Sequence, residues 1–349
     1  MPNPFFFAGK ITDPRHFVGR EKELKRIFGY LDTAHTGQIQ HASVVGERRI
    51  GKSSLLYHIC QVYEKYLPEH QKYRFVYIDL DNPHCHTQGG LLTYILKKLD
   101  IPIPEPLSLE SFYDRIEEQN KDDTWAVLLM DEFEHLSQRP DEFPDGFYDA
   151  LRSLGNNNFA GILTASQHTL QSLAAEEKLT SPFFNIFRQI DLGEFTEVDA
   201  NALLNRGRVS DQPFTDAECE EILKIAGKHP ACLQVVAGKV YEAKASGHPL
   251  NWKTIKAESV KEPPFANHVA TTEKKKNWLI KAGSWLFITL PQIVGKAFLQ
   301  FIGREQIADT TAWVWGAIWL LAGVSLLLGI LQWSTITKYV REILGLIFK

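Results

Sequence analysis

The sequence GERRIGKS occupies residues 46–53 and decides the fold class. It satisfies the pattern G-x-x-x-x-G-K-[ST] and comes directly after the short apolar run ASVV (42–45). It also opens a stretch, from residue 52 to about 66, whose apolar residues recur at helical spacing. A strand, a glycine-containing loop and a helix in this order are the context of a phosphate-binding P-loop. The stretch therefore predicts a nucleotide-binding α/β fold.

Each residue type in this loop has a chemical reason to be there. Gly46 and Gly51 permit the backbone to turn its N–H groups toward phosphate oxygens. Lys52 supplies a positive charge at the β- and γ-phosphates, and the hydroxyl of Ser53 can ligate Mg²⁺. We expect the nucleotide, ATP or ADP, to contact the whole loop: Gly46, Glu47, Arg48, Arg49, Ile50, Gly51, Lys52, Ser53 and Ser54.

A second, independent motif lies about 80 residues further along the chain. The apolar run AVLLM (126–130) predicts a buried strand that delivers Asp131 and Glu132 to its carboxyl end. We expect Asp131 to hold Mg²⁺ through water and Glu132 to polarise the attacking water. Together with Lys52 these residues predict an ATPase site.

Short apolar runs alternate with helical stretches through the first half of the chain, which predicts a parallel sheet with flanking helices. The predicted strands are 42–45, 74–81, 125–132, 159–166 and 190–192, and the predicted helices begin near Arg20 and cover 52–66, 88–99 and part of 146–154. From Thr196 onward the pattern is wholly helical, which predicts a small helical lid. The predicted organisation is a P-loop core (1–195), a lid (196–247), a linker (248–276) and membrane-associated helices (277–349).

The last part of the chain differs in composition from the rest. Residues 261–349 carry ten basic and five acidic side chains, and six of the eight tryptophans lie between Trp278 and Trp333. Residues 312–333 carry no formal charge and would span about 33 Å as a helix, enough for a hydrocarbon core of roughly 30 Å. The segment 278–303 contains Lys281, Pro291 and Lys296, so it fits an amphipathic helix in the membrane interface, or a second span. This predicts contact with membrane lipid and an inner-membrane protein whose ATPase domain faces the cytoplasm.

Composition excludes several other classes of protein. With 349 residues, 44% apolar and 23% charged, the chain is neither wholly disordered nor a polytopic membrane protein. The four cysteines form no C-x-x-C pair, and the amino terminus lacks the basic and apolar regions of a secretory signal. Residues 1–260 carry a net negative charge, so binding to nucleic acid is not expected.

Four segments, in this order, give the chain a family resemblance: FVGREKEL (17–24), SVVGERRIGKSSLL (43–56), LLMDEFEHL (128–136) and GKHPACL (227–233). They resemble the STAND branch of the AAA+-related P-loop ATPases, near its archaeal-type ATPases, over about residues 14–245. The resemblance implies that Val18, Gly19 and Arg20 contact the base or the phosphates. It also implies that His229, followed by Pro230, brings the lid to the nucleotide.

The resemblance also directs attention to arginines. Arg188, placed before the last predicted strand, resembles an arginine finger directed at a neighbouring subunit, and Arg139 and Arg152 are alternatives for that role. Family members often carry an arginine after the fourth strand, where this chain reads TASQ (164–167). Gln167 cannot supply that charge, so sensing of the phosphates there would rest on Thr164 or Ser166, or be weaker.

Three functions remain open from the sequence. The first is a STAND-like switch that forms a homo-oligomer when it binds nucleotide and responds to a protein trigger or partner. It would act through its membrane segment and perturb the bilayer in a defence or signalling response. The second is a membrane-anchored ATPase that docks or remodels a partner. The third is a DNA-associated ATPase, although residues 248–276 are too short for a winged helix.

Overall fold

The computed structural model describes residues 3–5, 9–121, 123–265 and 293. The chain divides into two compact units, Met1–Asn267 and His268–Lys349. The described strands and helices belong to the first unit. The predicted segments 278–303, apart from residue 293, and 312–333 lie outside the described residues.

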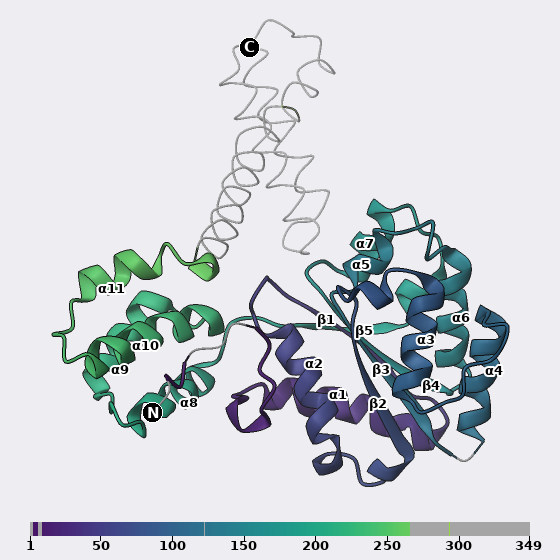
Figure 1. Cartoon of the computed structure of the whole chain (residues 1–349), viewed down its shortest axis with the longest axis horizontal. Coiled ribbons are helices and arrows are strands. Elements are labelled where there is room, and N and C mark those ends of the chain that lie inside the picture. Colours follow the sequence, from purple (N-terminus) through teal and green to yellow (C-terminus); the bar gives the residue numbers. More distant parts are fainter. Residues whose placement is uncertain (1–2, 6–8, 122, 266–292, 294–349) are drawn as a thin grey trace, which may run out of the picture. The chain divides into compact units, whose positions relative to one another are not determined.

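Five strands form one parallel sheet in the order β2-β3-β4-β1-β5 (Figure 1). The strands are β1 (His41–Val45), β2 (Tyr73–Asp79), β3 (Trp125–Asp131), β4 (Ala160–Ser166) and β5 (Phe187–Asp191). All five overlap the predicted strands. The predicted α/β fold with a parallel sheet is thus confirmed.

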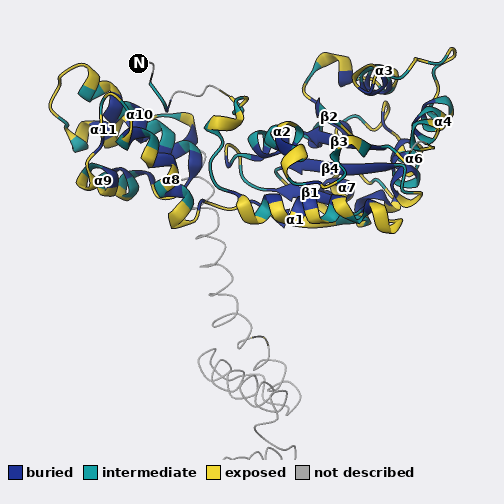
Figure 2. Ribbon diagram, turned by 90° about the horizontal axis from the view of Figure 1, so that it is seen from below, coloured by how far each residue is buried: buried dark blue, intermediate teal, exposed yellow. Residues whose placement is uncertain are grey.

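The central strands are apolar because both of their faces are covered. Every residue of β1, β3 and β4 is buried, and these strands lie as a dark layer between partly exposed helices (Figure 2). Successive side chains point to opposite faces: Leu128 and Met130 pack in one core, Val127 and Leu129 in the other.

Two groups of helices cover the two faces of the sheet. Residues of α1 (Glu21–Asp32) and α2 (Lys52–Val62) pack on one face. The other face is covered by α3 (Gln88–Lys98), α4 (Leu109–Asn120) and α6 (Asp145–Asn156), which lie together in Figure 1. The remaining helices of this part are α5 (Glu134–Ser137) and α7 (Leu170–Glu176).

After β5 the described chain is helical and has a core of its own. Capping boxes at Thr196 and Thr215 begin the first two helices, since each side chain accepts a backbone N–H that the helix leaves unpaired. Phe5, from the amino-terminal lead, is buried in this core. The helices are α8 (Glu197–Arg208), α9 (Asp216–Ala226), α10 (Pro230–Ala245) and α11 (Trp252–Ser259).

The predicted membrane localisation requires a correction. Among the residues that the structure describes, no helix has the length and the apolar character needed to cross a bilayer. The 16-residue α10 extends about 24 Å at 1.5 Å per residue, less than a hydrocarbon core of roughly 30 Å, and it carries Lys239 and Lys244. The structure therefore gives no support for placing the protein in the inner membrane.

A buried histidine connects two central strands. His41 is 4% exposed, and its Nδ1 accepts a hydrogen bond from the backbone N–H of Ile162 at 3.2 Å. Burial lowers the pKa of His41 from 6.5 to about 4. The folded protein therefore binds this proton less readily than the unfolded chain does.

This shift predicts acid destabilisation. The contribution of neutral His41 is complete above about pH 6.5 and is lost as the pH falls toward about 4, at a cost of about 3 kcal/mol in the free energy of unfolding. Urea unfolding at several pH values measures it, and His41→Gln should flatten this part of the pH dependence. The exposed His84 provides the control, because His84→Gln should leave the profile unchanged. An unaltered profile in His41→Gln would contradict the assignment.

Candidate nucleotide site

The P-loop connects β1 to α2 and is held close to the neighbouring strands. The Gly46 N–H donates to the carbonyl of Ser166 at 3.2 Å, which ties the loop to the end of β4. A Cβ at Gly46 would lie 2.6 Å from the carbonyl oxygen of Leu192, so only glycine fits. Gly51 has φ +106°, a conformation that glycine adopts without strain. Close packing thus requires glycine at position 46, and the backbone conformation favours it at position 51.

Lys52 is buried at the start of α2 and folds back on the loop. Its Nζ donates to the carbonyl oxygens of Gly46 at 2.9 Å and Glu47 at 3.1 Å. Burial lowers the pKa of Lys52, and the nearby carboxylates, Glu132 first, oppose that shift. A bound polyphosphate would supply the negative charge that this ammonium lacks at the loop.

Asp131 and Glu132 lie at the carboxyl end of β3. Asp131 is 2% exposed and accepts two hydrogen bonds, from the hydroxyl of Tyr77 (2.6 Å) and from the N–H of Glu132 (3.1 Å). The backbone of Glu132 is left-handed, with φ +53°, which is uncommon for a residue other than glycine. Burial, followed by the charges of Asp131 and Glu134, raises the pKa of Glu132, as suits a group that accepts a proton.

The donor set fits a magnesium ion that a nucleotide helps to bind. Ser53 and Asp131 line the same cavity of about 420 Å³ and offer the hard oxygen ligands that Mg²⁺ prefers. Glu134, whose charge acts on Glu132, has a buried Oε2 without a hydrogen-bond partner among the described residues. Within the described part of the chain, no cluster of three or more His, Cys, Asp or Glu side chains is placed to bind a metal ion. Mg²⁺ commonly binds through one or two protein ligands plus substrate phosphates.

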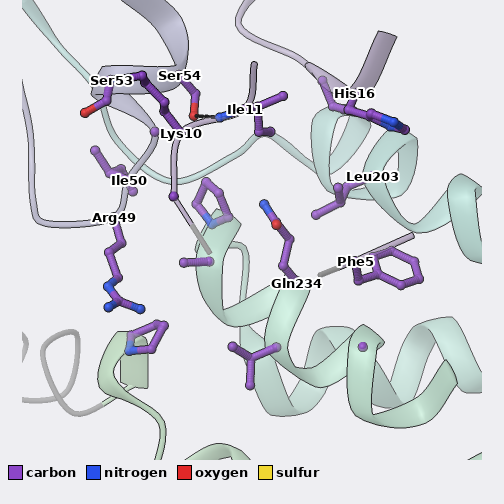
Figure 3. Close-up of a pocket in the computed structure, with 18 of the residues that line it drawn as sticks. Phe5, Lys10, Ile11, His16, Arg49, Ile50, Ser53, Ser54, Leu203 and Gln234 are labelled. Carbon is purple, nitrogen blue, oxygen red and sulfur yellow. Dashed lines mark hydrogen bonds between the residues drawn. The ribbon is translucent and has the colours of Figure 1, made fainter. Parts of the chain in front are cut away.

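A larger cavity, of about 880 Å³, lies against the P-loop (Figure 3). The loop contributes Arg48 to Ser54, and α10 contributes Pro230, Ala231 and Gln234, whose amide extends into the cavity. The amino-terminal lead forms a third side. There the Ile11 N–H donates to the Ser54 hydroxyl at 3.0 Å. The volume accommodates a nucleotide next to the loop.

The structure places Val18, Gly19 and Arg20 beside this cavity, where Val18 and Arg20 line it. The guanidinium of Arg20 is 5% exposed and donates to the carbonyl oxygens of Ile50 (3.1 Å) and Gly193 (2.7 Å). It therefore fixes the P-loop to the segment after β5. A contact between Arg20 and the nucleotide stays a prediction, because Nη2 of Arg20 already donates to the carbonyl oxygens of Ile50 and Gly193.

Two residues of the GKHPACL segment occupy the start of α10. His229 precedes the helix and is 1% exposed, whereas Pro230 is the first helical residue and lines the larger cavity. Proline is favoured at this position because its missing N–H would have no helical partner. The geometry brings Pro230, rather than the His229 side chain, to the cavity.

The predicted arginine finger lies away from the P-loop of its own chain. Arg188 is exposed and belongs to β5, one residue after its start, rather than preceding the strand as predicted. It pairs with Ala42, near the amino end of β1, whereas the P-loop follows the carboxyl end. Of the alternatives, Arg139 donates to the carbonyl of His135 at 2.6 Å, and Arg152 lies in α6.

The TASQ segment presents polar groups at the end of β4. Thr164 Oγ1 is buried and has no hydrogen-bond partner among the residues that the structure describes. The Ser166 hydroxyl donates to the carbonyl of His168 at 2.6 Å, and the Gln167 N–H donates to Glu134. Sensing through Thr164 or Ser166 stays a prediction.

Two residues at the site were not predicted from the sequence. Lys10 lines both cavities, and its Nζ lies 3.4 Å from Asp79 Oδ2. Tyr77 reaches Asp131 from the neighbouring strand. No local motif marks Lys10. Tyr77 could have been found from strand register, because Asp79 pairs with Asp131 and Tyr77 shares a face with Asp79.

Two family models match overlapping parts of the chain. The AAA domain model matches residues 36–174, and the model for Novel STAND NTPase 2 matches residues 119–248. No curated protein matches the sequence.

Several solved structures have a similar fold. The ORC2 protein of Aeropyrum pernix, in ADPNP-ADP complexes, has a TM-score of 0.59 and 17% identity over 98% of this chain and 89% of that one. The Walker-type ATPase PABY2304 of Pyrococcus abyssi has a TM-score of 0.53 and 17% identity over 89% and 92%. Cdc6p from Pyrobaculum aerophilum has a TM-score of 0.51 and 17% identity over 70% and 66%. At these identities the likeness concerns the fold.

Proposed function

On the premise that the chain is a STAND-type P-loop ATPase near the archaeal-type ATPases, we propose that it binds ATP with Mg²⁺ at residues 46–54 and hydrolyses it. The observation that carries the proposal is that residues from two elements meet at one cavity. Ser53 is the second residue of α2, Asp131 ends β3 and Glu132 follows it, and all three line the cavity of about 420 Å³. The structural relative from Aeropyrum pernix was solved with ADPNP and ADP, which agrees with this ligand class.

The residues divide the chemistry among them. Lys52 exchanges its bonds to the loop carbonyls for the β- and γ-phosphates. Ser53 and, through water, Asp131 would hold Mg²⁺, which when bound would neutralise charge on these phosphates. Glu132 accepts a proton from the water whose oxygen bonds to the γ-phosphorus, while the bond from that phosphorus to the β,γ-bridging oxygen breaks. The products are ADP and inorganic phosphate.

We further propose that nucleotide controls assembly into a homo-oligomer. Helix α10 and the P-loop line one cavity, so a nucleotide bound there would contact both the lid and the core. Arg188 is exposed on β5, which is an edge strand, and there it is accessible to a second copy. In that arrangement Arg188 would complete the site of the neighbouring subunit.

Particle size tests the switch. The chain should sediment as a larger species with a slowly hydrolysed ATP analogue than with ADP, because only the triphosphate extends to the γ-phosphate position. Analytical ultracentrifugation at matched protein concentrations measures the difference. Arg188→Ala should retain nucleotide binding and reduce hydrolysis by about 10³-fold if it is the finger. Identical particle size with both nucleotides would contradict the switch but would leave the ATP site standing.

A further inference from the structure

The hydroxyl of Tyr77 is directed at the carboxylate proposed to hold magnesium. Tyr77 belongs to β2, Asp131 to β3, and the O–H donates to Oδ2 at 2.6 Å. Asp131 Oδ1 accepts the Glu132 N–H at 3.1 Å. Each carboxylate oxygen therefore has one fixed donor, which determines the plane of the carboxylate. Each oxygen also keeps a further lone pair that can face a ligand.

The phenol ring of Tyr77 is itself held in place. The ring of Tyr57 meets it edge-on, with centroids 5.2 Å apart. Lys10 Nζ lies 4.5 Å from the ring centroid and pairs with Asp79 Oδ2 at 3.4 Å. The residue after Lys10, Ile11, is bonded to Ser54 in the first turn of α2. The amino-terminal lead thus supports the tyrosine that contacts Asp131.

We infer that Tyr77 is a positioning residue that orients the Asp131 carboxylate and thereby sets the affinity of the site for the divalent cation. The inference rests on the proposed function, because it takes Asp131 as a group that holds Mg²⁺. Hydrogen bonds to a ligating carboxylate fix its orientation, and their loss typically weakens metal binding by about 10- to 100-fold. Tyr77 touches neither substrate nor metal in this account and acts only through Asp131.

The experiment compares Tyr77→Phe with Tyr73→Phe. Both tyrosines lie on β2, Tyr73 buried and Tyr77 half-buried, and both substitutions remove one hydroxyl that donates a hydrogen bond. The Tyr73 hydroxyl donates to the carbonyl of Leu31, on α1, at 3.1 Å, away from Asp131. The full chain is loaded with ADP, and binding of Mn²⁺ is followed by electron paramagnetic resonance. The Mg²⁺ concentration for half-maximal ATP hydrolysis is measured in parallel.

Tyr77→Phe should weaken Mn²⁺ binding and raise the half-maximal Mg²⁺ concentration, each by about tenfold or more. Its ADP affinity in the presence of a chelator should stay at the wild-type value, and Tyr73→Phe should change neither metal parameter. Metal binding within twofold of wild type in Tyr77→Phe would overturn the inference. If Tyr77→Phe does not fold, Mn²⁺ binding by Lys10→Met tests the inference instead. Loss of that support for the ring should weaken Mn²⁺ binding severalfold, and unchanged binding would contradict the inference.

The two proposals fail in different ways. If wild-type protein binds neither ADP nor Mn²⁺, the proposed function itself is wrong. If wild type and Tyr77→Phe bind both equally well, only the role of Tyr77 is wrong.

Discussion

Replacing Lys52 with alanine should weaken ATP binding by at least about 100-fold. Hydrogen bonds to charged groups contribute roughly 1.5–3 kcal/mol each, and about 1.4 kcal/mol corresponds to a factor of ten in affinity. The ammonium of Lys52 already donates to two oxygen atoms within the loop, so it has the reach and the donors to bind two phosphates. Equilibrium titration with a fluorescent ATP analogue measures the change.

The matched control is Lys65→Ala. Lys65 is exposed and follows α2 closely, so its removal changes the net charge equally and leaves the P-loop alone. Its ATP affinity should stay within about twofold of wild type. Wild-type affinity in Lys52→Ala would end the assignment of residues 46–53 as the phosphate-binding loop.

Replacing Glu132 with glutamine should preserve ATP binding and reduce hydrolysis by about 10²- to 10⁴-fold, the usual contribution of a general base. The amide has the shape of the carboxylate and can still orient water, but it cannot accept the proton. The raised pKa of Glu132, caused first by burial, fits the proton-accepting role. Single-turnover measurement of phosphate release separates this chemical step from binding.

Glu64→Gln serves as the control for Glu132→Gln, because Glu64 is exposed and lies next to Lys65, outside both cavities. Its single-turnover rate should equal that of wild type. If Glu132→Gln also released phosphate at the wild-type rate, a different residue would have to accept the proton.

Strands were predictable where the apolar pattern is strong. Strand β3 is apolar from Trp125 to Met130, and β1 and β4 are buried along their whole length and include the apolar runs Val44–Val45 and Ile162–Leu163. Edge strand β5 begins at Phe187, three residues before the predicted start. Its exposed Arg188 and Gln189 interrupt the apolar signal.

Helices with few buried residues were missed. Helix α4 buries only Phe112 and Ile116 among its 12 residues, so its apolar stripe is weak. Helices α5 and α7 have 4 and 7 residues, too few for a helical period to stand out in the sequence.

The candidate site shows the same division between local and distant information. The P-loop and the pair Asp131–Glu132 each follow one strand directly, so their residue order alone suggests the chemistry. The support that Tyr77 gives Asp131 spans 54 positions, and the contact between Lys10 and Asp79 spans 69. Such contacts depend on strand register and on the path of the amino-terminal lead, neither of which a local motif encodes.

The central claim is that one ATP site forms where the P-loop meets the end of β3. The most direct test is an experimental structure of Glu132→Gln incubated with ATP and Mg²⁺, since this variant should retain the uncleaved nucleotide. The account predicts triphosphate density along residues 46–54, with Lys52 turned toward it and a metal between Ser53 and Asp131. Nucleotide density elsewhere, or a P-loop that stays empty at saturating ATP, would contradict the account.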